Sequence, residues 1–554
     1  MPKNWQGLGL LMLLPLATVA TAAAAGTSAA TTTAIPATAA TDAGLVKGTY
    51  AGGVAVYKGV PYAAPPVGAL RWREPQPVNQ WSGVREANAF APACMQKGVS
   101  MPGETPPATS EDCLYLNIWT PVSNKTPRAS EPTQRLPVIV WIHGGGYTNG
   151  SASMPLYWGD HLAHKGVVVV TIAYRLGPLG FLAHPQLTRE SSHRASGNYG
   201  LLDQLAALRW IQRNIAAFGG DPQQLTIAGQ SAGAMAVSIL MSSPQAKGLF
   251  QRAIGESGGL FEPLQIAPIY MLANAEHQGE KYFASLGGQS LIDMRKLPAQ
   301  ELLAGTAGEI NHPILDGYVL PTSPYDAFAA GRQNDVPLLV GSNVEEARAL
   351  IDVTRVSPAN FSRALEDSLG PLPPAIIAAY PYKTDFEARQ ARLQLETDLR
   401  FGWDMWAWAR LQAKTGHSAV YYYNFTRKPP FPEGSVYAHW GASHFAELWY
   451  VFDHLDQSPW AWSQSDRRLA EAMSDYWINF AKSGNPNGGR PDSSGPHDGN
   501  SGGGNPSGGN LPQWKPFAGD SGPVQYLGET ITSGVLPDTR KLQVLDTVYS
   551  GLRH

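Results

Sequence analysis

The segment Gly229-Gln230-Ser231-Ala232-Gly233 constrains the fold of this chain more than any other feature. An apolar run at 225–229 precedes the serine, and a helix-forming run at 232–241 follows it. A strand that turns directly into a helix with a serine at the turn is a nucleophile elbow, and only small flanking residues allow the strained turn. The start of such a helix directs free N–H groups at an oxyanion formed beside the serine. We therefore predict that Ser231 is a nucleophile that attacks esters.

The same G-x-S-x-G spacing occurs twice more, so context has to separate the three serines. The copy at 499–503 lies in a Gly, Pro, Asn and Ser tract, which is typical of a flexible loop. The copy at 255–259 follows a short apolar stretch, but its glycines and Pro263 disfavour a helix start. Only Ser231 has the strand, turn and helix that the motif requires.

Length and composition are those of a folded enzyme. The chain has 554 residues, of which 43% are hydrophobic and 15% charged, a balance that excludes disordered and fibrous proteins. The interior contains no obvious linker, so we expect one large α/β domain at 44–554. The formal net charge is −3 and no Lys/Arg cluster runs along the chain, so neither nucleic acid nor an anionic membrane is an expected partner.

The N-terminal residues 1–25 have the order of a signal peptide: Lys3, an apolar run at 8–17, and small residues at 22–25. The apolar run is short and Pro15 interrupts it, whereas a membrane span needs roughly 20 apolar residues. We therefore predict a secreted or periplasmic protein with no membrane span. The Ala/Thr-rich stretch at 26–43 is interpreted as a disordered lead-in.

The chain has only two cysteines, Cys94 and Cys113. In an exported protein such a pair favours a disulfide, with two buried free thiols as the alternative. The sequence contains no H-E-x-x-H and no paired C-x-x-C, so neither a metal site nor a cofactor is predicted.

Several apolar runs are short enough to be strands buried on both faces, which is typical of a largely parallel sheet. These runs are 136–142, 167–173, 225–228, 336–340 and 419–425. Between them, apolar residues from Leu201 to Ile215 recur at helical spacing, so we expect helices on both faces of the sheet. A second helical pattern at 469–482 leads into a polar, Gly-rich stretch at 485–510, which predicts a mobile surface insertion.

A serine nucleophile needs a histidine base and a carboxylate that orients the histidine. In folds with this elbow the chain order is nucleophile, acid, base, and each partner follows a strand. The strand at 336–340 is followed by Glu345 and Glu346, and spacing alone does not choose between them. The strand at 419–425 is followed by His444 among small residues, with His439 as the competitor.

An oxyanion hole requires backbone N–H groups that converge on one point, and glycines allow that close approach. The residues His143-Gly144-Gly145-Gly146 directly follow the predicted strand at 136–142. This placement matches the H-G-G-G loop that supplies such N–H groups.

These motifs, taken together, resemble the type B carboxylesterases of the α/β-hydrolase superfamily, relatives of the cholinesterases. The resemblance runs from about residue 44 to the C-terminus. Besides the elbow and the glycine loop, it rests on the segments 57–63, 111–117, 174–181, 197–203 and 214–222. It implies the α/β-hydrolase fold, in which a large, mostly parallel central sheet carries helices on both faces.

The resemblance also implies roles for individual residues. Ser231 would be the nucleophile, Glu346 rather than Glu345 the acid, and His444 the base. The N–H groups of the oxyanion hole would come from Gly145, Gly146 and Ala232. The pair Cys94–Cys113 matches the first disulfide loop of the family.

Two departures from the family pattern bear on specificity. Glutamate often precedes the nucleophile in the family, but this chain has the neutral Gln230, and no tryptophan lies between Cys94 and Cys113. A quaternary ammonium group would lack both an anionic and a cation–π partner, so choline esters are not the expected substrates.

The sequence therefore predicts a serine carboxylesterase that hydrolyses a small-molecule ester through an acyl-enzyme. Two alternatives stay open. One is a catalytically silent adhesion or recognition module on the same fold, which the intact motifs disfavour. The other is a specialised esterase such as a lipase, a feruloyl-type esterase or a toxin-ester hydrolase. The oligomeric state is left open.

Overall fold

The computed structural model describes residues 37–99, 101, 104–122, 135–264, 268–288, 290–305, 310–488 and 511–553. The predicted signal peptide and the first part of the predicted lead-in lie outside these ranges. The last part of the predicted lead-in is wrong, because residues Ala37–Thr41 form strand β1, which pairs antiparallel with β2 (Gly44–Ala51). The folded domain therefore begins inside the stretch that composition alone assigned to disorder.

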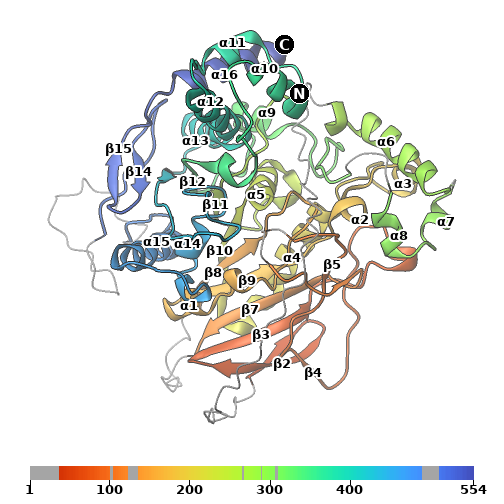
Figure 1. Ribbon diagram of the computed structural model, residues 1–554. Helices are drawn as coiled ribbons and strands as arrows, with labels where there is room; N and C mark the ends of the chain where they lie inside the picture. The colour runs from red at the N-terminus through yellow and green to blue at the C-terminus, as the bar shows by residue number, and fades with distance from the viewer. Residues whose placement is uncertain are drawn as a thin grey trace, which may run out of the picture.

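A large sheet dominates the molecule (Figure 1). Its strand order is β1, β2, β3 (Val54–Pro61), β7 (Tyr115–Pro121), β9 (Val168–Ile172), β8 (Leu136–Ile142), β10 (Gly220–Gln230), β11 (Arg252–Glu256), β12 (Leu338–Asn343), β13 (Val420–Phe425), β14 (Val524–Leu527) and β15 (Thr532–Gly534), with β4 (Val84–Glu86) beside β2. The central strands from β9 to β14 run parallel. Antiparallel pairs close both ends. A separate two-stranded sheet joins β5 (Ala93–Cys94) and β6 (Thr109–Ser110).

Both faces of this sheet are apolar, because successive side chains of a strand point to opposite sides. In β8, Val138 and Val140 belong to one hydrophobic core and Ile139 and Trp141 to the other. The first core is completed by α4 (Tyr199–Asn214), α5 (Ala232–Ser242) and α13 (Trp403–Thr415). The second is completed by α1 (Asp160–His164), α14 (Leu448–Val451) and α15 (Gln464–Ser483). The predicted arrangement, a mostly parallel central sheet with helices on both faces, is confirmed.

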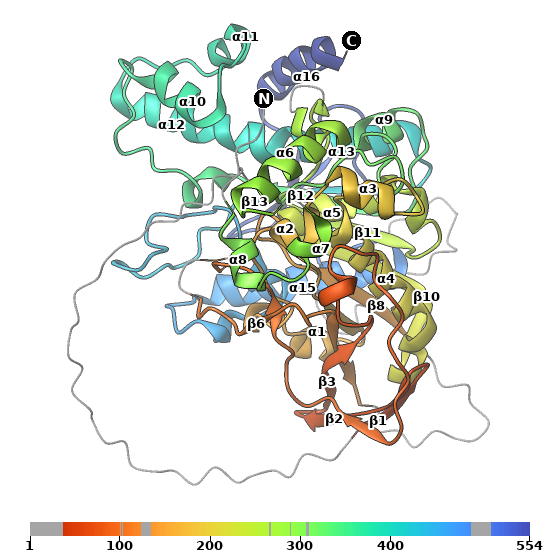
Figure 2. The same ribbon diagram turned by 90° about the vertical axis from the view of Figure 1, so that its right-hand side faces the viewer.

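The described residues form ten further α-helices. They are α2 (Gly177–Phe181), α3 (Pro185–Glu190), α6 (Leu272–Ser285), α7 (Leu291–Met294), α8 (Ala299–Leu303), α9 (Pro324–Ala329), α10 (Phe361–Leu369), α11 (Pro374–Ala378), α12 (Asp385–Thr397) and α16 (Arg540–Arg553). Figure 2 shows α10, α11, α12 and the C-terminal α16 grouped at one end of the molecule. The C-terminal helix α16 packs against α11, so the end of the chain contacts a helix that lies well before it in the sequence.

Most predicted boundaries lie within two residues of the observed ones, although the strand expected at 225–228 spans Gly220–Gln230. Two of the differences have local causes. The strand expected at 336–340 begins only at Leu338, since Pro337 has no N–H to pair, and it continues to Asn343 alongside β13. The helix expected at 469–482 begins at Gln464. It starts there because Ser463 and Asp466 form a capping box.

The first four residues of the predicted surface insertion at 485–510 have a defined structure. Residues 485–488 are described, and Asn487 donates to the Trp514 carbonyl at 2.8 Å while accepting from the Trp514 N–H at 2.7 Å. These two bonds join the segments that flank residues 489–510. Residues 489–510 themselves lie outside the described ranges.

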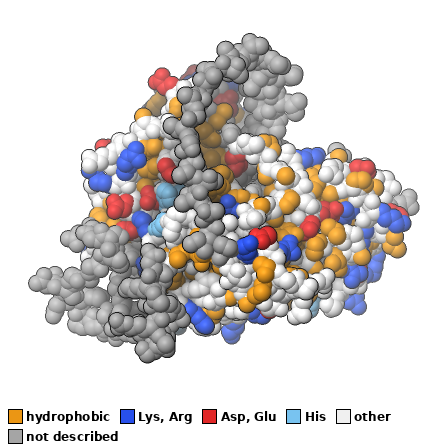
Figure 3. All heavy atoms as spheres, turned by 90° about the horizontal axis from the view of Figure 1, so that it is seen from below, with side chains coloured by type: hydrophobic (Ala, Val, Ile, Leu, Met, Phe, Trp, Pro, Cys, Tyr) orange, Lys and Arg blue, Asp and Glu red, His pale blue; other side chains and the backbone are white. Residues whose placement is uncertain are grey.

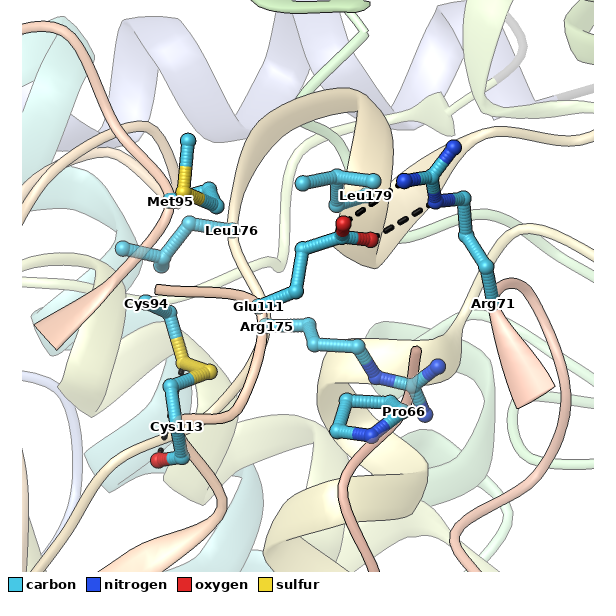
Figure 4. A pocket seen from close by; sticks show the side chains of 9 residues that line it. All are labelled: Pro66, Arg71, Cys94, Met95, Glu111, Cys113, Arg175, Leu176 and Leu179. Atoms are coloured by element: carbon cyan, nitrogen blue, oxygen red, sulfur yellow. Dashed lines mark hydrogen bonds and ion pairs between the residues drawn. A yellow bond between two sulfur atoms is a disulfide. The ribbon is translucent and has the colours of Figure 1, made fainter. Parts of the chain in front are cut away.

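The predicted disulfide between Cys94 and Cys113 is present, with the two Cα atoms 5.0 Å apart. Beside it, the Arg71 guanidinium donates to both carboxylate oxygens of Glu111 at 2.6 Å (Figure 4). The same guanidinium donates to the carbonyl of Met294 at 3.0 Å. The cross-linked loop is thereby fixed to the end of α7.

The described helices include none that is both long and apolar enough to cross a membrane. On the face shown in Figure 3, positive and negative side chains are interspersed among hydrophobic ones.

Candidate active site

The turn from β10 to α5 holds Ser231 in a conformation that side chains other than glycine rarely adopt. Its φ is 57° and its ψ is −125°. The flanking glycines leave no room for larger residues: a Cβ on Gly233 would lie 2.0 Å from the carbonyl oxygen of Ile142, and one on Gly229 would lie 2.5 Å from the backbone of Gly233. Strain of this kind persists only where the surroundings enforce it, and it is found at functional sites.

The structure places Glu346 against His444. His444 Nδ1 lies 2.7 Å from Glu346 Oε2, and the other carboxylate oxygen accepts a 2.7 Å bond from the N–H of Asn343. The N–H of His444 also donates to the Glu346 carbonyl at 3.3 Å. Both side chains are buried, so the carboxylate and the ring are fixed relative to each other.

The neighbouring Glu345 points elsewhere. Its carboxylate pairs with Arg348 at 2.9 Å and Lys428 at 3.1 Å and accepts from the N–H of Ala442 at 3.0 Å. His439, the competing histidine, is exposed. The geometry thus separates the two carboxylates and the two histidines that spacing alone left undecided.

The imidazole of His444 has two further contacts. The amide nitrogen of Gln230 lies 3.3 Å from Nε2 and 3.4 Å from Nδ1, so the amide faces the ring rather than one nitrogen. The ring of Phe401 stacks on the imidazole with centroids 4.4 Å apart. The Ser231 hydroxyl makes no hydrogen bond with a described residue. Catalytic hydrogen bonds are often long in substrate-free enzymes and tighten when substrate binds.

The glycine loop after β8 lies against the elbow. A Cβ on Gly144 would lie 3.0 Å from the Cβ of Ser231. The backbone is left-handed at Gly145 (φ 104°) and Gly146 (φ 61°), which favours glycine at both positions. The N–H groups of Gly145, Gly146 and Ala232 donate to no acceptor among the described residues, so they are free to bind an oxyanion.

His143 anchors the start of this loop. Its ring stacks on Tyr174 with centroids 4.4 Å apart, and the Tyr174 hydroxyl donates to the His143 carbonyl at 2.7 Å. Burial lowers the pKa of His143 to about 4. At neutral pH the His143 ring is therefore uncharged. Its contacts with Tyr174 hold the start of the glycine loop in place.

Two buried acids near the site were not predicted from the sequence. Glu256 accepts a 2.7 Å bond from Trp477 Nε1, and burial raises the pKa of Glu256 to about 8. Glu447 accepts from Asn343 Nδ2, and burial, with the charges of Glu346 and Glu256, raises the pKa of Glu447 well above its ordinary value. In the sequence, a glutamate next to a motif residue gives little indication of a raised pKa, because only the fold shows that its carboxyl group is buried.

Asn343 also contributes to this site and was not predicted from the sequence. Its side-chain amide donates to the carbonyl of Ser443 at 2.7 Å, and its backbone N–H holds Glu346. One asparagine at the end of β12 thus joins the loop of the acid to the loop of the histidine.

Comparison with known proteins gives a consistent result. Residues 36–543 match the model of the carboxylesterase family. The chain is 39% identical over 469 residues to the fumonisin B1 esterase of Sphingopyxis macrogoltabida, a match that covers 81% of this chain and 82% of that protein. It is 37% identical over 469 residues to the para-nitrobenzyl esterase of Bacillus subtilis, covering 80% and 90%. A solved PNB esterase structure superimposes with a TM-score of 0.74 at 33% identity, covering 92% of this chain and 99% of that one.

Proposed function

Because the chain belongs to the carboxylesterase family and has the α/β-hydrolase fold, we propose that this carboxylic ester hydrolase acts through an acyl-enzyme on Ser231. The observation that carries the proposal is the bond between His444 and Glu346, which lies beside a strained serine turn. Ser231 would act as the nucleophile, His444 as the base and Glu346 as the acid.

In the first step, the Ser231 oxygen attacks the ester carbonyl and its proton passes to Nε2 of His444. Glu346 accepts the hydrogen bond of Nδ1–H, which fixes the tautomer and stabilises the imidazolium. The N–H groups of Gly145, Gly146 and Ala232 stabilise the oxyanion. His444 then protonates the departing alcohol oxygen, and the acyl group stays on the serine.

In the second step, water attacks the acyl-enzyme while His444 takes its proton. The acid product leaves when the tetrahedral intermediate collapses, and Ser231 regains its proton from the imidazole. Each proton that leaves a nucleophile is thus returned to a leaving group.

We infer that the substrates are uncharged esters rather than choline esters. Gln230 brings a neutral amide, not a carboxylate, to the imidazole. The names of the relatives, fumonisin B1 esterase and para-nitrobenzyl esterase, refer to different esters. Family membership therefore does not identify the ester that this chain hydrolyses. Turnover of butyl, benzyl and choline esters of one acid measures this preference, and efficient choline-ester turnover would contradict it.

Export from the cytoplasm is part of the proposal. It is supported by the signal-like order of residues 1–25 and by the disulfide, since disulfides persist in oxidising compartments. Sequencing the N-terminus of the protein purified from its natural host tests this, and a chain that retains residues 1–25 in the cytoplasm would contradict it.

A covalent probe tests the acyl-enzyme directly. Phenylmethanesulfonyl fluoride should modify one serine per chain, and peptide mass spectrometry should place the adduct on Ser231. Modification of Ser257 or Ser501, which have the same local spacing, would overturn the assignment. A protein that resists the probe and hydrolyses no ester would instead be the silent recognition module.

A further inference from the structure

Two histidines and an aspartate from distant parts of the chain meet on the second face of the sheet. Asp160 and His161 belong to α1, and His454 follows α14. One ligand atom from each of the three lies within 4.8 Å of the other two. His454 Nε2 already lies 3.2 Å from Asp160 Oδ1. None of these residues belongs to the proposed triad or to its contacts.

The hydrogen bonds of His161 give its ring the tautomer that a metal ligand needs. Nδ1 lies 2.8 Å from the carbonyl oxygen of Asp453, so this nitrogen carries the proton and donates. In the neutral ring the lone pair is then on Nε2, which lies 3.8 Å from a carboxylate oxygen of Asp456. A histidine that binds a metal typically donates its other N–H to a carbonyl in this way.

One ligand of the cluster is buried and the other two are partly exposed to solvent. The side chain of His454 is 0% exposed, whereas those of His161 and Asp160 are 33% and 37% exposed. The two imidazole rings are almost perpendicular, with centroids 4.6 Å apart, so they do not stack. An ion could therefore enter from solvent, and Asp456 or water could complete its ligands.

We propose that Asp160, His161 and His454 bind a zinc ion, with Asp456 or a water molecule as the fourth ligand. Imidazole nitrogen and carboxylate oxygen together suit Zn²⁺, which takes four such ligands in a tetrahedron. Tetrahedral bonds to zinc require ligand atoms roughly 3.4 Å apart. The pair from Asp160 and His454 already meets this spacing at 3.2 Å, and the ligand atom of His161 lies within 4.8 Å of both.

This proposal revises the sequence-based expectation that the chain binds no metal. That expectation rested on ligand motifs that are local in the sequence, whereas His454 lies 294 residues after Asp160. The bound ion would cross-link α1 to the segment after α14. We therefore expect it to stabilise the fold without taking part in ester hydrolysis.

The alternative is an ordinary hydrogen-bonded pair between Asp160 and His454 that binds no ion. Titration of Co²⁺ into the full chain, prepared without a histidine tag and treated with a chelator, separates the two. The site should bind one Co²⁺ per chain with visible d–d absorption, and Zn²⁺ should displace it. Absence of saturable binding in the unmodified protein would overturn the proposal.

Matched variants locate the ion. His161→Gln removes a partly exposed ligand, and His164→Gln makes the same change at an exposed histidine of the same helix. His161→Gln and Asp160→Asn should each weaken Zn²⁺ binding at least about tenfold, while His164→Gln should not. Zinc should raise the thermal midpoint of the unmodified protein and of His164→Gln only. Equal binding by all three variants would place the ion elsewhere and overturn the site.

Discussion

Glu346 and His444 are 98 residues apart in the sequence, yet the Glu346 carboxylate accepts a 2.7 Å bond from the His444 ring. The reason lies in the sheet. β12 and β13 are parallel neighbours, in register from Leu338 with Val420 to Asn343 with Phe425, so the loops that follow them leave the same edge. The elbow after β10 leaves that edge as well. Loops at the carboxyl ends of neighbouring parallel strands can thus share one site.

Replacing Glu346 with glutamine should lower kcat for a p-nitrophenyl ester by about a thousandfold or more, because the wrong tautomer of His444 is then favoured. Glu345→Gln is the control, since the Glu345 carboxylate binds Arg348 and Lys428 instead. Steady-state kinetics of the two variants gives the comparison. Equal losses in both, or a loss only in Glu345→Gln, would show that the acid is misassigned.

Ser231→Ala should reduce turnover by several orders of magnitude while the thermal midpoint stays near that of the unmodified protein. Ser501→Ala removes a serine with the same G-x-S-x-G spacing and should leave turnover unchanged. Near-normal activity of the Ser231 variant would refute the acyl-enzyme on this residue.

Gln230→Glu should move the acidic limb of the pH profile of kcat/KM to higher pH by about one unit. The added carboxylate would lie near both ring nitrogens of His444, where it stabilises the protonated imidazole and so extends the inactive form. Turnover of choline esters relative to neutral esters should rise in the same variant. A profile that does not shift would mean that the side chain of residue 230 does not face the ring in solution.

The buried Glu256 should make the folded state less stable at high pH. Burial raises the pKa of Glu256 from 4.5 to about 8, so the folded state holds this proton more tightly than the unfolded state does. The resulting stabilisation is complete below about pH 4.5 and is lost as the pH rises through about 8. The thermal midpoint of Glu256→Gln should therefore fall less between these pH values than that of the unmodified protein.

The exposed Glu280 provides the control for this measurement. Glu280→Gln should keep the pH dependence of the unmodified protein. If Glu256→Gln also keeps it, the carboxyl group is not the source of the dependence.

Removing the disulfide with Cys94→Ala and Cys113→Ala should lower the free energy of unfolding by about 3 kcal/mol, because the unfolded chain regains the entropy of the closed loop. Urea unfolding of the double variant measures the change. A stability equal to that of the unmodified protein, together with two titratable thiols in the latter, would show that the bond is absent.

The sequence predicted the parts of this molecule that local patterns determine. The small residues around Ser231 and the apolar runs on both sides of it require a strand, a tight turn and a helix. The strand at 136–142 coincides with β8 because its continuous apolar run is buried on both faces. The start of α15 was missed, although Ser463 and Asp466 have the spacing of a capping box.

What the sequence could not supply depends on side-chain direction and burial. Glu345 and Glu346 are adjacent and chemically identical, and only the turn after β12 decides which one faces His444. The buried acids Glu256 and Glu447 are ordinary glutamates until the sheet and α15 enclose them. Long-range assembly, not residue type, gives these groups their properties.

The edge strand β1 also sets a limit for shortened versions of the protein. A chain that starts at Gly44 would leave the N–H and C=O groups along the first half of β2 without the partner strand at Ala37–Thr41. Unpaired edges recruit strands from other molecules, so such a chain would tend to associate. Truncations meant for crystallisation should therefore keep residue 37 and everything after it.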